Sequence, residues 1–128
     1  RSDKVKIAIS EYLQLNPTKT IKDVTIACLG LAFKPDIDDL RESPAVEICR
    51  QLAAQHSGTV LAVEPNVEEL PPKLRESLIL ADIDTALAKS DVIVLLVDHK
   101  QFKAIPKSAL GDRKFVDTRG VWTANISR

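Results

Sequence analysis

The sequence predicts an α/β fold, because short apolar runs alternate along it with segments that repeat apolar residues at helical spacing. Nearly continuous apolar runs of this length are typical of strands that helices cover on both faces of a parallel sheet. Strands joined through helices make right-handed crossovers in such a sheet. We therefore expect a Rossmann-like, doubly wound parallel sheet in a three-layer αβα arrangement, preceded by an N-terminal helix.

The first two elements are an amphipathic helix and a central strand. Residues 3–15 repeat apolar side chains at helical spacing, and Asn16-Pro17 ends the pattern. The run VTIACL at 24–29 is short, almost entirely apolar and stopped by Gly30. It predicts a strand that is buried on both faces.

A second helix and a second strand follow. Ser43 and Pro44 predict the N-cap and the first-turn proline of a helix. The buried stripe of that helix consists of Ala45, Ile48, Cys49, Leu52 and Ala53. Residues 59–63 predict the next strand, which Glu64-Pro65 closes.

The last part of the chain alternates in the same way. Residues 71–72 are two prolines that mark a surface loop, and residues 82–89 predict a short helix. The run VIVLLV at 92–97 is rich in β-branched residues and predicts a buried parallel strand. Residues 115–116 predict the last strand, after which Gly120 turns the chain.

Length and composition bound the function. The 128 residues suffice for one domain with its own core, and 18 Lys and Arg balance 18 Asp and Glu. Zero net charge gives no general attraction for nucleic acid or anionic membranes, so the expected ligand is small. No apolar run reaches the roughly 18 residues of a membrane span. Cys28 and Cys49 lie in apolar patterns without metal-binding spacing, so we expect buried thiols, no metal site and a cytoplasmic location.

A long polar loop is the strongest candidate for a ligand site. Residues 30–45 read GLAFKPDIDDLRESPA and join a strand to a helix at the sheet edge where α/β domains bind ligands. Lys34 in this loop and Arg119 after the last strand would leave the same edge and could converge on a phosphate. Phe33 is either a plug over the core or a platform for a ligand ring. Arg41 stands among four acids, which could hold it in an internal ion-pair network.

Two further polar residues follow strands, and the structural interpretation is favoured for both. Glu64 occupies the place of a ribose-binding acid, but Gly30 is the only glycine of a dinucleotide fingerprint at the first strand. We expect Glu64 to be a solvated or loop-pinning carboxylate. His99 has no acid-base partner in the sequence pattern, so we expect a hydrogen-bonded structural histidine and assign no catalytic residue.

Four segments occur in the order of a known domain: GLAFKPDIDDLRESPA at 30–45, VEP at 63–65, VIVLLVDH at 92–99 and FVDTRG at 115–120. Together they resemble the C-terminal UDP-binding domain of the UDP-glucose/GDP-mannose dehydrogenase family. IDDLRESPA and VDHKQF look most similar to members that act on UDP-N-acetyl-D-mannosamine.

The resemblance implies roles for individual residues. Phe33, Lys34 and Arg119 would contact the UDP-sugar, and Arg41 would reach NAD across a domain interface. Residues 1–19 would be a connecting helix, and residues 20–128 the UDP-sugar-binding domain of a longer enzyme. In the family, NAD is held mainly by an N-terminal domain, and a central region carries the nucleophilic cysteine.

The function implied by the resemblance is that of an NAD-dependent UDP-N-acetyl-D-mannosamine 6-dehydrogenase, which oxidises the sugar C6 alcohol to a carboxylate for surface polysaccharide biosynthesis. Its partners would be the UDP-sugar, the remaining domains and further copies of the same chain. This chain alone would be inactive. The alternatives are a UDP-glucose 6-dehydrogenase domain, a non-catalytic interaction or regulatory domain that docks through the charged loop, and an assembly role for the helix at 3–15.

Overall fold

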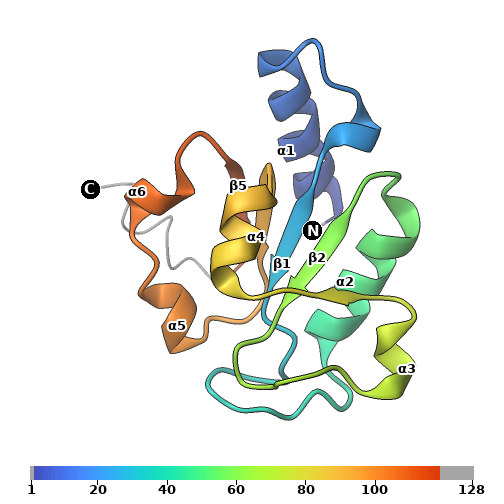
Figure 1. The fold of residues 1–128 in the computed structure, drawn as a ribbon, viewed down its shortest axis with the longest axis vertical. Coiled ribbons are helices and arrows are strands. Elements are labelled where there is room, and N and C mark those ends of the chain that lie inside the picture. Colours follow the sequence, from blue (N-terminus) through green and yellow to red (C-terminus); the bar gives the residue numbers. More distant parts are fainter. Residues whose placement is uncertain (1, 119–128) are drawn as a thin grey trace.

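A single sheet of five parallel strands runs through the part of the chain that this computed structural model describes, residues 2–118 (Figure 1). The strand order is β3-β2-β1-β4-β5. The strands are β1 (Ile26–Leu29), β2 (Val60–Val63), β3 (Ile79–Leu80), β4 (Val92–Leu95) and β5 (Lys114–Asp117). The helices are α1 (Ser2–Leu15), η1 (Ile21–Asp23), α2 (Pro44–Gln55), α3 (Pro72–Arg75), α4 (Ile83–Lys89), α5 (Lys100–Lys103) and α6 (Lys107–Leu110).

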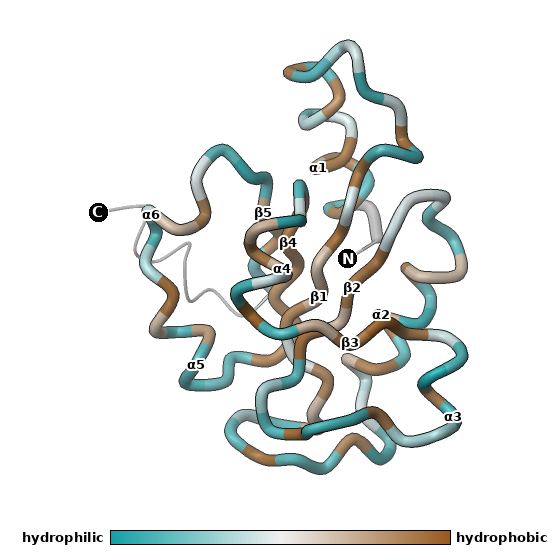
Figure 2. Tube along the Cα trace, in the orientation of Figure 1, coloured by the Kyte–Doolittle hydropathy of each residue, from teal (hydrophilic) through white to brown (hydrophobic). Residues whose placement is uncertain are grey.

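Helices cover both faces of this sheet. Along β1, Ile26 and Cys28 pack in one cluster with α1 and α2, whereas Ala27 and Leu29 pack in the other with α4, α5 and α6. Successive side chains of a strand point to opposite faces, so one short strand supplies both halves of the core. Figure 2 shows that the strands are mostly apolar, whereas the loops and parts of the helices around them are hydrophilic. The predicted three-layer αβα arrangement is confirmed.

Helix α1 is part of the folded unit. Its residues Val5, Ala8 and Ile9 are buried against the sheet. The Tyr12 hydroxyl donates a hydrogen bond to Asp91 Oδ1 at 2.9 Å, and Asp91 Oδ2 accepts the Thr25 N–H at 2.9 Å. Asp91 therefore ties the helix to the amino ends of two strands. No helix in residues 2–118 is both long and apolar enough to cross a membrane.

The predicted elements are all present among the described residues, with ends that shift by one or two positions. Sequence reasoning missed β3, and it also missed the four-residue helices α3, α5 and α6. Two or four residues are too few to show a period of 2.0 or 3.6, and Ile79 of β3 is more than half exposed. The proline pair was predicted to be loop, but Pro72 begins α3, as proline can in a first turn. The turn at Gly120 lies outside the described residues.

The topology creates one place where the winding direction changes. Strand β1 pairs with β2 on one side and with β4 on the other, all in parallel. The connections from β1 and β4 leave this point toward opposite faces of the sheet, and such a switch point is where open α/β sheets bind ligands. The loop after β1, residues 30–43, and the segment after β4, residues 96–99, meet there (Figure 1).

Gly30 allows the chain to turn at this point. Its φ is +99°, and a Cβ atom placed on it would lie 2.6 Å from Val97 Cβ and 2.9 Å from Val97 N. A side chain is therefore excluded both by backbone conformation and by the close approach of the segment after β4.

Gly30→Ala is expected to lower the free energy of unfolding by roughly 2–4 kcal/mol, since it combines backbone strain with a clash against a main chain. Urea unfolding measures this. Gly111→Ala is the matched control, because Gly111 also has a positive φ but its nearest neighbour is the flexible end of Arg113, at 3.3 Å. An equal loss in both variants would contradict the packing argument.

Candidate functional site

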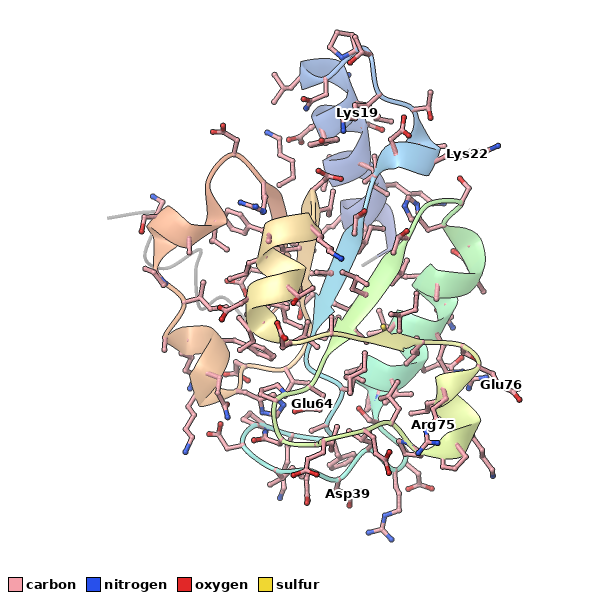
Figure 3. The ribbon with its side chains drawn as sticks, viewed as in Figure 1. Lys19, Lys22, Asp39, Glu64, Arg75 and Glu76 are labelled. Atoms are coloured by element: carbon pink, nitrogen blue, oxygen red, sulfur yellow. The ribbon has the colours of Figure 1, made fainter. Side chains whose placement is uncertain are left out.

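Glu64 lies directly after β2 and contacts the segments that leave β1 and β4 at the switch point (Figure 3). Only 2% of its surface is exposed. Its Oε1 accepts the backbone N–H groups of Leu31 at 3.0 Å and Ala32 at 2.9 Å, and its Oε2 accepts that of Asn66 at 3.0 Å. The carboxylate therefore binds the start of the long loop from the sheet side.

His99 is the side-chain partner of this carboxylate. The buried imidazole places Nε2 2.8 Å from Glu64 Oε1, and its Nδ1 accepts the Asp36 N–H at 2.8 Å. A backbone N–H can only donate, so Nδ1 carries the lone pair and Nε2 carries the hydrogen that faces the carboxylate. One histidine thus joins β2, β4 and the loop.

The surroundings of Glu64 favour its ionised form. Burial raises the pKa of the carboxyl group, but the hydrogen bonds from His99, Leu31 and Asn66 outweigh it, and the pKa lies below its ordinary value. Both oxygens already accept hydrogen bonds from the domain itself, three at Oε1 and one at Oε2, so the carboxylate binds the loop rather than a ribose. Of the two roles expected for it, loop pinning is confirmed and the solvated carboxylate is wrong. The structural role expected for His99 is also confirmed.

Further hydrogen bonds hold the loop to neighbouring segments and to the start of α2. The Asn66 side-chain amide donates to the Ile37 carbonyl at 3.2 Å, and the Lys100 N–H donates to Asp36 Oδ1 at 2.7 Å. Ser43 occupies the predicted N-cap position of α2, but its hydroxyl makes no cap hydrogen bond and donates instead to the Ala32 carbonyl at 3.1 Å. The loop is therefore fixed at both ends.

Phe33 and Lys34 stand on the outer side of this fixed loop. Phe33 is 53% exposed, which excludes the interpretation as a plug over the core. Lys34 is exposed and forms no ion pair with any described residue. The two side chains border a hollow of about 160 Å³ that Pro44, Ile48 and Leu96 also line. A ring face and an unpaired cation are thus presented side by side at the switch point.

Arg41 lies on the rim of the same loop. Its side chain is 88% exposed, and its Nε and Nη2 each lie 3.1 Å from an oxygen of Asp39. The alternative of an ion-pair network with four acids is therefore wrong: in the described chain, Asp39 is the only acid that pairs with Arg41. The side-chain hydrogen bond from Arg41 and a backbone one lower the pKa of Asp39. An exposed pair of this kind contributes little to stability, so the guanidinium stays available.

The remaining predictions concern Arg119 and the two cysteines. Arg119 lies outside the described residues, and its convergence with Lys34 stays a prediction. Cys28 and Cys49 are buried free thiols, as expected. The hydrogen bond with Cys49, followed by burial, raises the pKa of the Cys28 thiol well above its ordinary value, which disfavours a nucleophilic thiolate. No metal-binding group of His, Cys, Asp and Glu is found among residues 2–118.

The geometry of this site is consistent with the protein family whose sequence pattern the chain matches. The UDP-binding domain of the UDP-glucose/GDP-mannose dehydrogenase family matches residues 27–124, which include the loop and all five strands except the first residue of β1. The chain belongs to this family. The resemblance seen in the four sequence segments is therefore confirmed.

Relatives within the dehydrogenase family are similar over most of the chain. It is 54% identical over 120 residues to the UDP-N-acetyl-D-mannosamine dehydrogenase of Salmonella typhi, and 48% identical over 106 residues to the NDP-N-acetyl-D-galactosaminuronic acid dehydrogenase of Ralstonia solanacearum. These alignments cover 94% and 83% of the chain but only 28% and 25% of the two relatives. The chain thus spans little more than a quarter of their length.

A solved structure shares the fold. The UDP-N-acetyl-mannosamine dehydrogenase from Staphylococcus aureus superimposes with a TM-score of 0.67 at 27% identity, over 93% of this chain and 25% of that one. The Rossmann-like α/β fold of the domain therefore has a solved counterpart in the family.

Glu64→Gln is expected to lower the free energy of unfolding at pH 7 by about 1–3 kcal/mol, because its amide N–H₂ would face the Asn66 N–H and leave a buried donor unsatisfied. The folded-state pKa of Glu64 is lowered, so its contribution is present above the unfolded-state pKa and is lost as the pH falls through the folded-state value.

Urea unfolding of both proteins from pH 7 to pH 3 measures this contribution. The difference between native chain and Glu64→Gln should shrink on acidification, since a protonated Glu64 also turns a donor toward its neighbours. A difference that stays constant across this range would contradict a role for the ionised carboxylate.

Proposed function

We propose that this chain is the UDP-sugar-binding domain of an NAD-dependent UDP-N-acetyl-D-mannosamine 6-dehydrogenase, the enzyme that oxidises the sugar C6 alcohol to a carboxylate for surface polysaccharide biosynthesis. One observation carries the proposal: exposed Phe33 and Lys34 lie side by side at the switch point of a chain that belongs to a UDP-binding family. The identity of 54% with a UDP-N-acetyl-D-mannosamine dehydrogenase supports the choice of sugar.

The chemistry of a UDP-sugar suits these side chains. Its pyrophosphate carries negative charge, which Lys34 can neutralise as a point charge without first breaking an ion pair. The ring of Phe33 offers an apolar face to the uracil or the sugar. Arg119 would add a second cation from the end of β5. Strand β5 ends beside β4, because Asp117 pairs in register with Leu95.

NAD requires a different part of the enzyme. Among the described residues, Gly30 is the only glycine in the turn after β1, and this turn leads into a long loop rather than a helix. Glu64 is occupied by four hydrogen bonds. These residues do not build a dinucleotide cradle, so NAD is held mainly by another domain. Arg41, exposed on the rim, is the residue proposed to reach NAD from this one.

The proposed domain assignment places a connecting helix within residues 1–19, where the structure describes α1, and the UDP-sugar-binding domain at residues 20–128. The longer enzyme is proposed to act as a homo-oligomer. Free Cys28 and Cys49 support a reducing compartment, the cytoplasm.

Most contacts to the sugar are proposed to come from other parts of the enzyme. A relative named for NDP-N-acetyl-D-galactosaminuronic acid is 48% identical to this chain, so the 54% identity favours N-acetyl-D-mannosamine by a narrow margin. A UDP-glucose 6-dehydrogenase domain is the second candidate. A non-catalytic interaction or regulatory domain, the remaining alternative, would show no change in thermal stability when a nucleotide is added.

Lys34→Ala is expected to bind UDP about tenfold more weakly than the native chain, because a charge-assisted hydrogen bond to a phosphate contributes roughly 1.5 kcal/mol or more. Calorimetric titration with UDP measures the affinity, which should be weak for a domain that supplies one wall of the cleft. Lys22→Ala is the control, since Lys22 is exposed in η1, distant from the loop (Figure 3). Identical heats for native chain and Lys34→Ala would count against the site.

The isolated chain is expected to show no turnover with UDP-N-acetyl-D-mannosamine and NAD. Both of its cysteines are buried, and one thiol is held in its protonated form, so neither supplies a nucleophile. Absorbance at the wavelength of NADH measures the rate. Any NADH formation above a reaction without protein would overturn the proposed division of labour between domains.

A further inference from the structure

We propose that Glu64 and His99 are positioning residues for the nucleotide site: together they hold Phe33 and Lys34 in place and couple that placement to the protonation of His99. The inference rests on the proposed function of Phe33 and Lys34. Neither Glu64 nor His99 faces the ligand side, since both side chains are fully buried on the sheet side of the loop.

The geometry fixes the loop on both sides of the two exposed residues. Before Phe33, the N–H groups of Leu31 and Ala32 donate to Glu64 Oε1. Two positions after Lys34, the N–H of Asp36 donates to His99 Nδ1. Because Nε2 of His99 contacts the same Glu64 oxygen at 2.8 Å, one buried pair anchors both ends of the segment that carries Phe33 and Lys34.

The second anchor depends on the protonation state of His99. Nδ1 can accept the Asp36 N–H only while it keeps its lone pair. A proton taken up at Nδ1 would set one N–H against another and release the loop after Lys34, whereas the bond from Nε2 to Glu64 would persist. Asp36 has a φ of +63°, a conformation that non-glycine residues rarely adopt and that this hydrogen bond helps to hold.

Charged groups lie on the elements around His99. Glu64 after β2 contacts its Nε2, and the Asp36 carboxylate accepts the Lys100 N–H. On α5, Lys103 Nζ lies 3.9 Å from Asp98 Oδ2. The Phe102 ring, whose centroid lies 5.4 Å from that of His99, closes the remaining side. The side-chain nitrogen of Asn66 also lies 3.3 Å from His99 Nδ1.

A buried acid-histidine pair is a poor device for stability alone. Desolvation of the two groups offsets most of their attraction, and apolar side chains of similar size commonly stabilise a core as well. The pair does give the loop one specific shape, because Glu64 and His99 together accept the backbone N–H groups of Leu31, Ala32, Asp36 and Asn66.

The test uses three variants of this chain. His99→Gln keeps a donor for Glu64 and an acceptor for Asp36 but cannot take up a proton in this range. His99→Phe removes both. His56→Gln is the matched control: His56 is the chain's other histidine, and its Nε2 lies 2.7 Å from the Val24 carbonyl at the opposite edge of the sheet.

The expected results concern both affinity and its pH profile. At pH 7.5, His99→Phe should bind UDP about tenfold more weakly, and His99→Gln within about twofold of the native chain. Between about pH 7.5 and 5.5, the native chain and His56→Gln should lose affinity for UDP more steeply than His99→Gln. The pH dependence of His99→Gln serves as the baseline, because it reports the titration of the UDP phosphate alone. Equal slopes in the native chain and His99→Gln, or native affinity in His99→Phe, would overturn the proposal.

Two measurements without ligand keep this inference separate from the proposed function. Nitrogen-15 chemical shifts of His99 should show a hydrogen on Nε2 and none on Nδ1 at pH 7.5. Hydrogen exchange at the Asp36 amide, corrected for its intrinsic pH dependence, should lose protection on acidification in the native chain but not in His99→Gln. If the native chain binds no UDP, the proposed function fails, while these results still decide the role of the pair. A hydrogen on Nδ1, or unchanged protection, would refute it.

Discussion

The contact between Glu64 and His99 is the interaction on which the ligand-binding edge depends. It joins the exits of β2 and β4, and through Leu31 and Asp36 it reaches the loop after β1. A loop as long as the one at residues 30–43 has many conformations in water, and ordering each residue costs entropy. Hydrogen bonds made away from water, to partners that cannot move, select one of these conformations.

This constraint separates two kinds of polar residue in the same loop. The inner groups, such as the Ser43 hydroxyl and the amide of Ala32, make hydrogen bonds within the domain. The outer side chains of Phe33, Lys34 and Arg41 remain exposed, on a backbone that is held from behind. A site arranged in this way can offer charge and apolar surface to a ligand without reorganising first, which lowers the cost of binding.

The prediction from sequence was accurate where the signal was local. Runs such as those at 24–29 and 92–97 identify buried strands, because their apolar residues are adjacent in the chain. The pairing of Glu64 with His99 was not predicted, since the two are 35 residues apart and each stands alone in its own segment. Their shared position at strand exits was the only available signal. Arg41 shows the opposite error: four nearby acids suggested a network, but loop geometry brings only Asp39 to it.

The sequence by itself determined the fold class and the family, because periodicity, turn residues and the segment at 30–45 are all properties of neighbours along the chain. The tertiary structure decided which polar residues are structural and which are free to bind. That division depends on burial, and burial at a sheet edge depends on strand order. Only the parallel packing of β2, β1 and β4 places Glu64 and His99 beneath the loop, and leaves Phe33 and Lys34 above it.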